Sequence, residues 1–392
     1  MATSKHPHRA DDRPGEHTGD IVVCSLEAWD DVWRRNQFFV QYLVDADQGV
    51  RVLFVEPPVD IALELAKRRL PGRVGLRQVT SDGRLWALRP RKVLPRVLGR
   101  GSVDSALAAC VRRAVATLAL RSPLLWVNDA TYAGLAEEVP WPVVYDITDD
   151  WLLAGSDSRT VKRLRVCDAK LLGRAEEAVV VSQSLLASRG KARAVHLIGC
   201  GADVAHFAAP RPRPSDLPPS PVAVYVGTQH EMRLDVELCV ATARAIRPAT
   251  LVFVGPNCLR HESARRLAGA GCVLLGARPY EDVPAYYQHA DVVVVPHAVN
   301  SFTESLDPIK GYECLAAGRP TVSTAVAGMR DLGPPIEVAA PAIFAARVSQ
   351  LLGENRPSEP RPAPTWAQRA EAFAAVLESA RRKRLATTGT SA

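Results

Sequence analysis

Short runs of apolar residues, rich in valine and other β-branched types, recur along the chain and predict buried strands. The clearest is Ala290–Val295, which ends in four consecutive valines before Pro296. A strand that is apolar throughout, rather than at alternate positions, is typical of a parallel sheet covered on both faces. Similar runs occur at 20–25, 50–56, 85–88, 124–127, 143–146 and 178–182 in the first half, and at 223–227, 250–254, 272–275, 292–295 and 321–323 in the second.

Segments with the apolar spacing of helices separate these runs. The spacing predicts helices over 33–44 and 103–120 and near the end of the chain, where the periodic positions are Trp366, Arg369, Phe373 and Leu377. Strands that alternate with helices imply right-handed crossovers and a parallel sheet. We therefore predict an α/β protein.

A proline-rich segment at 208–221 divides the chain near its middle. It has too many prolines for a helix or a central strand, so we expect a stiff linker. At 392 residues and 47% hydrophobic content, the chain is long enough for two domains with separate cores. The predicted organisation is a disordered tail (1–19), a Rossmann-like domain (20–207), the linker (208–221), a second Rossmann-like domain (222–360) and a terminal helix (361–386).

Composition narrows the class of protein. The net charge is +7, carried mostly by arginine, and alanine and proline are also abundant, a bias typical of a high-G+C actinobacterial genome. The basic residues are not interleaved with exposed aromatics, so we expect no nucleic acid partner. The first twenty residues contain no apolar run and no later segment is long and apolar enough to span a bilayer, so we expect a cytoplasmic protein. The eight cysteines lack metal-ligand or redox spacing, so we expect neither a disulfide nor a bound metal.

The segment from Ser301 to Pro320 combines features of an anion site. It follows the 292–295 strand, and Pro308 suits the first turn of a helix because its missing N–H is not needed there. The N-terminus of that helix presents free backbone N–H groups, and Lys310 adds a positive charge. Glu313 lies one turn further on, where a carboxylate can chelate a diol. The pattern indicates a phosphorylated ligand that carries a diol.

The motif Asp307-Pro308-x-Lys310-x-x-Glu313, followed by Ala-Ala-Gly-Arg-Pro at 316–320, resembles the donor-binding half of family 4 glycosyltransferases of the GT-B fold. Many members carry two glutamates eight positions apart, and here the first position is Ser305. The Pro-x-Lys loop resembles the branch typified by teichuronic acid and exopolysaccharide enzymes. The resemblance implies two Rossmann-like domains that face one cleft, a terminal helix that crosses back to the first domain, a UDP-linked sugar as co-substrate, no metal or other cofactor, and retention of configuration.

By the same resemblance, residues that follow the strands of the second domain hold the donor. The expected diphosphate contacts are Gly227, Thr228, Arg233 and Lys310, and Glu313 is the expected ribose contact. The base would lie beside Arg278, Pro279 and Tyr280, and the donor sugar beside Glu304, Ser305, Leu306, Asp307 and Pro308. His230 and His297 also follow strands and are further donor-side candidates. Simpler alternatives are a solvated basic helix start for Arg233 and Lys310, core packing for Tyr280 and a solvent-facing side chain for Glu313.

Acidic and aromatic residues follow the strands of the first domain. We expect Trp29, Asp30, Arg35 and Asp129 to contact the acceptor, with Asp149 and Asp150 as acceptor contacts, one of which acts as a base if the reaction inverts configuration. Their alternative is structural, because helix caps and turns favour aspartate.

The transferred group is expected to be a hexose or amino-hexose, and the acceptor has two candidate classes, of which the first is preferred. A carboxylate-rich cleft attracts a polycationic acceptor, which favours a small cationic natural product such as an aminoglycoside intermediate in antibiotic biosynthesis. Basic residues among leucines and valines between Lys67 and Arg100 favour instead a lipid-linked cell-envelope glycan reached by peripheral membrane contact. A third reading, an inactive nucleotide-sugar sensor, follows from the missing glutamate at Ser305.

Overall fold

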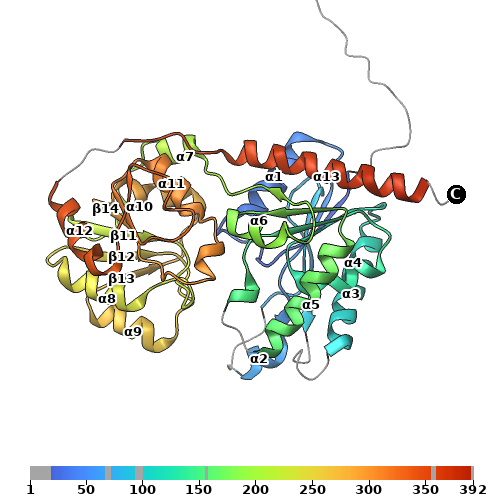
Figure 1. The fold of residues 1–392 in the computed structure, drawn as a ribbon, viewed down its shortest axis with the longest axis horizontal. Helices are drawn as coiled ribbons and strands as arrows, with labels where there is room; N and C mark the ends of the chain where they lie inside the picture. The colour runs from blue at the N-terminus through green and yellow to red at the C-terminus, as the bar shows by residue number, and fades with distance from the viewer. Residues whose placement is uncertain (1–18, 67–71, 93–99, 155–157, 355–358, 390–392) are drawn as a thin grey trace, which may run out of the picture.

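The computed structural model describes residues 19–66, 72–92, 100–154, 158–354 and 359–389. These form two α/β domains that lie side by side (Figure 1). Each domain has one large, mainly parallel sheet, so the predicted α/β class is confirmed. The predicted tail, except Gly19, lies outside the described residues, and so do Lys67, Arg68, Arg69 and Arg96 of the predicted basic cluster.

The N-terminal sheet, as far as the chain is described, has eight strands in the order β10-β9-β8-β7-β1-β2-β5-β4. Its strands are β1 (Ile21–Cys24), β2 (Val52–Val55), β4 (Gly75–Gln78), β5 (Leu85–Arg89), β7 (Leu124–Val127), β8 (Val143–Ile147), β9 (Glu177–Val180) and β10 (His196–Leu197). All pairs are parallel except β4 with β5. The central strands are buried on both faces, because helices cover both sides.

Helices and short elements complete this domain. They are α1 (Arg35–Ala46), α2 (Ile61–Ala66), α3 (Arg100–Thr117), η1 (Ala130–Tyr132), α4 (Ala133–Glu138), η2 (Trp151–Leu153), α5 (Ser158–Arg174), α6 (Gln183–Arg189) and α7 (Val204–Ala208), with a small parallel pair of β3 (Val59–Asp60) and β6 (Arg91–Lys92). The predicted linker begins with the last residue of α7, and from Ala209 to Pro221 it contains neither helix nor strand. Leu217 within it is buried, so the segment packs against the protein.

The C-terminal sheet has the order β13-β12-β11-β14-β15-β16 and is parallel throughout its described pairs. Its strands are β11 (Val222–Val226), β12 (Thr250–Val254), β13 (Val273–Gly276), β14 (Val292–Val295), β15 (Thr321–Ser323) and β16 (Ile336–Val338). The helical elements are α8 (Val236–Ala245), α9 (His261–Gly269), η3 (Tyr280–Asp282), α10 (Val283–Gln288), η4 (Thr303–Ser305), α11 (Ile309–Ala317) and α12 (Pro341–Glu354). Pro308 is the N-cap of α11 rather than a residue of its first turn, and Gly318 ends the helix in the left-handed conformation.

The terminal helix α13 (Trp366–Gly389) leaves the C-terminal domain and lies along the N-terminal domain beside α1 (Figure 1). Trp366 stacks on Phe38 of α1, with 4.3 Å between ring centroids, and Phe373 packs on Trp126 of β7 at 4.5 Å. These aromatic contacts bury the apolar face of α13 in the N-terminal core. The last helix therefore ties the two domains together.

Candidate active site

A cavity of about 760 Å³ lies between the two domains, and residues of both line it. In each sheet the chain reverses its order of strands at one point, between β1 and β7 in the N-terminal sheet and between β11 and β14 in the C-terminal sheet. Loops that leave the carboxyl ends of strands at such a point separate and leave a crevice. The two crevices face each other across the cavity.

Lys310 lies in the first turn of α11, at the C-terminal wall of the cavity. Its Nζ is 5.3 Å from the centre of the Tyr225 ring, and it lies over Gly227, where a Cβ would be 3.2 Å from the ammonium. Burial and the nearby charge of Arg233 lower the pKa of Lys310 to about 8, although Glu313 raises it. A cation that is partly stripped of water in this way gains strongly from an anionic ligand.

Arg233 follows β11 and extends toward the N-terminal domain. Its Nη2 donates a hydrogen bond of 3.1 Å to Asp149, and its guanidinium lies 5.6 Å from the ring centre of Phe302. The side chain keeps 33% of its exposure. Two cations, Arg233 and Lys310, thus approach the cavity from different elements, and no described carboxylate pairs directly with Lys310.

Glycine is required at the turn after β11. Gly227 has φ +134° and Gly255, after β12, has φ +136°. A Cβ on Gly255 would lie 2.3 Å from the Gly227 carbonyl oxygen, so the two loops touch through their backbones. Gly227 and Thr228 line the cavity beside Gly255. A backbone loop in this position suits a diphosphate.

Glu313 lines the cavity one turn beyond Lys310. Its Oε2 accepts a hydrogen bond of 2.7 Å from the Tyr287 hydroxyl. Burial raises the pKa of Glu313, while Tyr287 and Lys310 act in the opposite direction. Since Tyr287 fixes one oxygen from behind, Oε1 is the atom left for a ligand.

The loop after β13 is held more firmly than the sequence suggested. The Arg278 guanidinium donates to the Tyr286 hydroxyl at 2.9 Å and pairs with Asp216 of the linker. The Tyr280 ring stacks on His206 at 4.7 Å and on Trp33 of the other domain at 6.2 Å. Both side chains still line the cavity, whereas Pro279 borders a smaller neighbouring hollow. Tyr280 therefore combines the two roles that the sequence left open, core packing and cavity wall.

Ser305 and Glu304, which were expected to contact the donor sugar, make their contacts away from the cavity in this structure. Ser305 is fully buried and faces the N-terminal domain: its hydroxyl accepts a hydrogen bond from the Asp150 backbone N–H at 3.2 Å, and its carbonyl accepts one from Ser182 at 2.7 Å. Glu304 turns outward to Arg330, with contacts of 2.7 and 2.8 Å. Neither residue lines the cavity.

The rest of that loop, Leu306 to Pro308, does line the cavity. Asp307 is fixed at both oxygens, because it accepts the Cys200 N–H at 2.5 Å and the Tyr312 hydroxyl at 2.7 Å. Gly199 lies so close that a Cβ there would be 2.5 Å from the Asp307 carboxylate. The Asp307 carboxylate thus joins the domains and leaves little capacity for a sugar hydroxyl.

Arg35 and Asp146 form a buried ion pair at the N-terminal wall. The Nη1–Oδ2 distance is 2.6 Å, and the side chains are 5% and 0% exposed. Trp126 donates to the same carboxylate at 3.0 Å, and Arg35 also donates to the Ile198 carbonyl at 3.1 Å. These contacts give Arg35 a structural role. Arg35 also lines the cavity, and its Nε has no hydrogen-bond partner among the described residues.

The adjacent residues Asp149 and Asp150 have different environments. Asp150 accepts two hydrogen bonds from Arg189, at 2.9 and 3.0 Å, and does not line the cavity, so its predicted catalytic role is not supported by its position. Asp149 lines the cavity, and its side chain pairs with Arg233. Burial raises the pKa of Asp149, and Arg233 counters this shift.

Of the remaining predicted acceptor contacts, one lines the cavity and two do not. Asp129 lines the cavity but caps η1 by accepting the Thr131 N–H at 2.9 Å. Asp30 is exposed and pairs with Arg34 at 3.1 Å. Trp29 packs edge-on against Phe54. Neither Asp30 nor Trp29 lines the cavity.

Glu27, which lies just before these residues, does line the cavity. Desolvation raises its pKa to about 7, with Arg34 acting against this shift and Asp149 adding to it. Two weakly paired carboxylates, Glu27 and Asp149, therefore face the cavity from the N-terminal side.

Two features of the site were not predicted from the sequence. One is Arg189, which neutralises Asp150, and the other is the set of apolar residues on the N-terminal wall. Ile147, Trp151, Leu152 and Leu164 line the cavity from β8, η2 and α5. No local signal marks them, because their position depends on how α5 packs on the sheet.

Comparisons with known proteins agree with this geometry. Residues 220–354 match the family model of glycosyl transferases group 1. The chain is 22% identical over 256 residues to the putative teichuronic acid biosynthesis glycosyltransferase TuaH of Bacillus subtilis, a match that covers 59% of this chain and 64% of TuaH. The chain thus spans just under two thirds of that relative's length.

Solved structures show the same fold over nearly the whole chain. Sucrose-phosphate synthase from Thermosynechococcus elongatus has a TM-score of 0.64 at 18% identity, with 94% of each chain covered. Anabaena HepE in complex with UDP and glucose has a TM-score of 0.59 at 16% identity, with 95% of this chain and 100% of that chain covered. The family match thus covers the C-terminal domain, and the solved structures show that the chain as a whole has the GT-B fold.

Proposed function

We propose that this protein transfers a glycosyl residue from a UDP-linked sugar to an acceptor hydroxyl. The observation that carries the proposal is that Lys310 lies over Gly227 while Arg233, near enough to lower the pKa of Lys310, lines the same cavity. Cleavage of the glycosidic bond of a nucleotide sugar leaves negative charge on the departing diphosphate. Two pre-positioned cations at that point stabilise the charge as it develops.

The other donor contacts follow from position along the cavity wall. Glu313 Oε1 accepts from the ribose hydroxyls, and the loop of Arg278 and Tyr280 borders the base. The sugar lies against Leu306 and Pro308, on the side of the cavity toward Asp149 and Glu27. Similarity to HepE, whose structure holds UDP and glucose, supports a uridine nucleotide.

Calorimetric titration with UDP-glucose, UDP and uridine tests the donor site. We expect UDP to bind more tightly than uridine by about 3 kcal/mol or more, as two charge-assisted contacts contribute. Production of free UDP from UDP-glucose then tests for an enzyme. Tight UDP binding without turnover of any nucleotide sugar would favour an inactive sensor instead.

For the acceptor, we infer a lipid-linked cell-envelope glycan. The name of TuaH supports a cell-envelope polysaccharide, and the apolar N-terminal wall suits a carrier lipid or its first sugar. The case for a cationic acceptor is weaker than the sequence indicated, because Asp146, Asp149 and Asp150 are each paired with an arginine of the protein. Glu27 and Asp129 still line the cavity, so the acceptor class needs the direct test described below.

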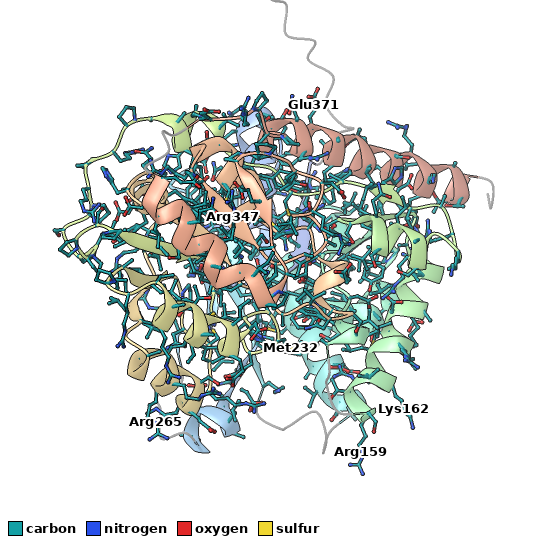
Figure 2. All side chains as sticks on the ribbon, turned by 60° about the vertical axis from the view of Figure 1, so that its left-hand side comes forward. Arg159, Lys162, Met232, Arg265, Arg347 and Glu371 are labelled. Carbon is teal, nitrogen blue, oxygen red and sulfur yellow. The ribbon has the colours of Figure 1, made fainter. Side chains whose placement is uncertain are left out.

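An exposed surface formed by η2 and the first half of α5 also supports a lipid-linked acceptor. Leu153 and Val166 are 43% and 56% exposed, and Lys162 and Arg165 are exposed near them. Figure 2 shows Arg159 and Lys162 at the lower end of the N-terminal domain, away from Glu371 of α13. A mixed basic and apolar surface favours contact with anionic lipid. No helix within the described residues has the length and apolarity needed to cross a bilayer.

Transfer assays decide between the acceptor classes. The purified protein would be given labelled UDP-sugars with either a polyprenyl-diphosphate-linked sugar in vesicles or paromamine in solution. We expect product with the lipid-linked acceptor only. Product with paromamine alone would reverse the assignment of the acceptor while leaving the donor proposal intact.

A further inference from the structure

His297 is a buried side chain that neither the family motif nor the cation pair accounts for. It follows β14 and Pro296, is 1% exposed and lines the cavity. Its backbone is fixed on both sides, because its N–H donates to the Val295 carbonyl at 3.0 Å and its carbonyl accepts the Thr324 hydroxyl at 2.7 Å. The imidazole therefore has a fixed place between the β14 end and the cavity.

The hydrogen bonds around Tyr225 select the tautomer of His297. The Tyr225 hydroxyl lies 3.2 Å from the Thr228 carbonyl oxygen and 3.3 Å from His297 Nε2. A carbonyl oxygen only accepts, so the phenol proton goes to Thr228 and the phenol oxygen accepts from Nε2–H. In the neutral imidazole, Nδ1 is then left with a lone pair. Among the described residues Nδ1 has no hydrogen-bond partner.

The charge state agrees with this arrangement. Burial lowers the pKa of His297 well below its usual value, and Lys310 and Arg233 lower it further. The ring is neutral at physiological pH, and Nδ1 is an acceptor. A buried acceptor without a partner is unfavourable, and a ligand in the cavity removes this penalty if it brings a donor.

The chemistry of a nucleotide sugar decides which part can bring that donor. Phosphate oxygens only accept at neutral pH, so the diphosphate next to Lys310 and Arg233 cannot pair with a lone pair. Hydroxyls of the donor sugar and of the ribose both donate, and the ribose hydroxyls are those assigned above to Glu313. Resting on the function proposed above, we propose that His297 Nδ1 accepts a hydrogen bond from a hydroxyl of the donor sugar, and that His297 is a specificity-determining residue for that sugar.

Two variants separate this role from a structural one. His297→Phe keeps a planar ring without an acceptor, and His297→Asn places an amide oxygen near the position of Nδ1. Wild type and variants would be titrated calorimetrically with UDP and with UDP-glucose, UDP-galactose, UDP-N-acetylglucosamine and UDP-glucuronic acid. We expect His297→Phe to weaken the best-bound UDP-sugar about tenfold, equal to the loss of one hydrogen bond, and to leave UDP unchanged. His297→Asn should recover most of the loss.

Deoxy donors provide the control for misfolding, because they need only the wild-type protein. For one deoxy analogue of the best-bound sugar, the affinity of the wild type should fall by the same factor as the affinity of His297→Phe falls for the parent sugar. The variant should bind that analogue no more weakly than it binds the parent sugar. Equal weakening of UDP and UDP-sugar, no weakening of either, or additive losses from deoxy donor and variant would each overturn the proposal. If wild type binds no uridine nucleotide, it is the proposed function that fails.

Discussion

Arg233 of the C-terminal domain reaches across the cleft to Asp149 of the N-terminal domain, with 3.1 Å between Nη2 and Oδ1. The same arginine is the expected contact of the donor diphosphate. A diphosphate, with more charge than one carboxylate, competes for the guanidinium. Donor binding and the freeing of Asp149 at the acceptor side are thus coupled through one side chain.

Replacing Asp149 with asparagine tests this competition. Because the Asp149 charge no longer holds Arg233, UDP should bind about fivefold more tightly, as expected for a partly exposed pair worth about 1 kcal/mol. Titration with UDP measures the change. Asp30→Asn is the matched control, since Asp30 is exposed and pairs with Arg34 instead. Unchanged or weaker binding in Asp149→Asn would rule out the coupling.

Lys310→Met tests the diphosphate site directly. The substitution removes a positive charge at similar side-chain length, so UDP binding should weaken about 10- to 100-fold, while uridine binding stays within about twofold of wild type. Both are measured by titration. An equal loss for uridine and UDP would show that Lys310 is structural.

The pKa of Lys310, lowered to about 8, predicts a pH dependence of donor binding. Below pH 8 the ammonium is charged and binds diphosphate, and above pH 8 the free protein loses this charge. The UDP association constant should therefore be level from pH 6.5 to 7.5 and fall above pH 8, by about tenfold per pH unit at most. Lys310→Arg keeps its charge throughout this range, so its profile should be flat. A wild-type profile that is level to pH 9.5 would contradict the prediction.

The sequence predicted the sheets well where strands are buried on both faces. Strand β14 matches its predicted range residue for residue, because four β-branched residues between Asp291 and Pro296 favour a short buried strand. Strand β4 was missed, since Gly75–Gln78 is an exposed antiparallel edge with no apolar run. Local pattern carries no information about such an edge.

The cavity lining was predictable where it follows from local features of the chain. Lys310, Glu313 and the turn at Gly227 follow from strand ends and helix starts, which are local features. Asp149 and Asp150 are neighbours in sequence with opposite surroundings, because Arg189 reaches one and Arg233 the other. Those partners are 39 and 84 residues away, so only the tertiary structure separates a structural carboxylate from one that faces the cavity.

Arg35→Met tests the structural role assigned to Arg35. The change leaves Asp146 buried without its cation, so the protein should lose about 3–5 kcal/mol of stability, measured by denaturant unfolding. If the role of Arg35 is structural alone, transfer activity per folded molecule should change little. Gln41→Met, on an exposed position of the same helix, serves as the control. Normal stability with lost acceptor binding would restore the acceptor role.

Ser305→Glu restores the glutamate that many members of the family carry at this position, and we expect it to harm the protein. Ser305 is fully buried and exchanges hydrogen bonds with Asp150 and Ser182 of the other domain, so a carboxylate there would be desolvated beside Asp150 without a cation free to pair with it. The thermal midpoint should fall by about 5 °C or more, since an unpaired buried charge costs several kcal/mol. Ser305→Ala is the control and should cost only the hydrogen bonds of the hydroxyl, about 1 kcal/mol each. If Ser305→Glu instead keeps its midpoint and raises the transfer rate, the loop can turn toward the cavity, and Ser305 belongs to the sugar site after all.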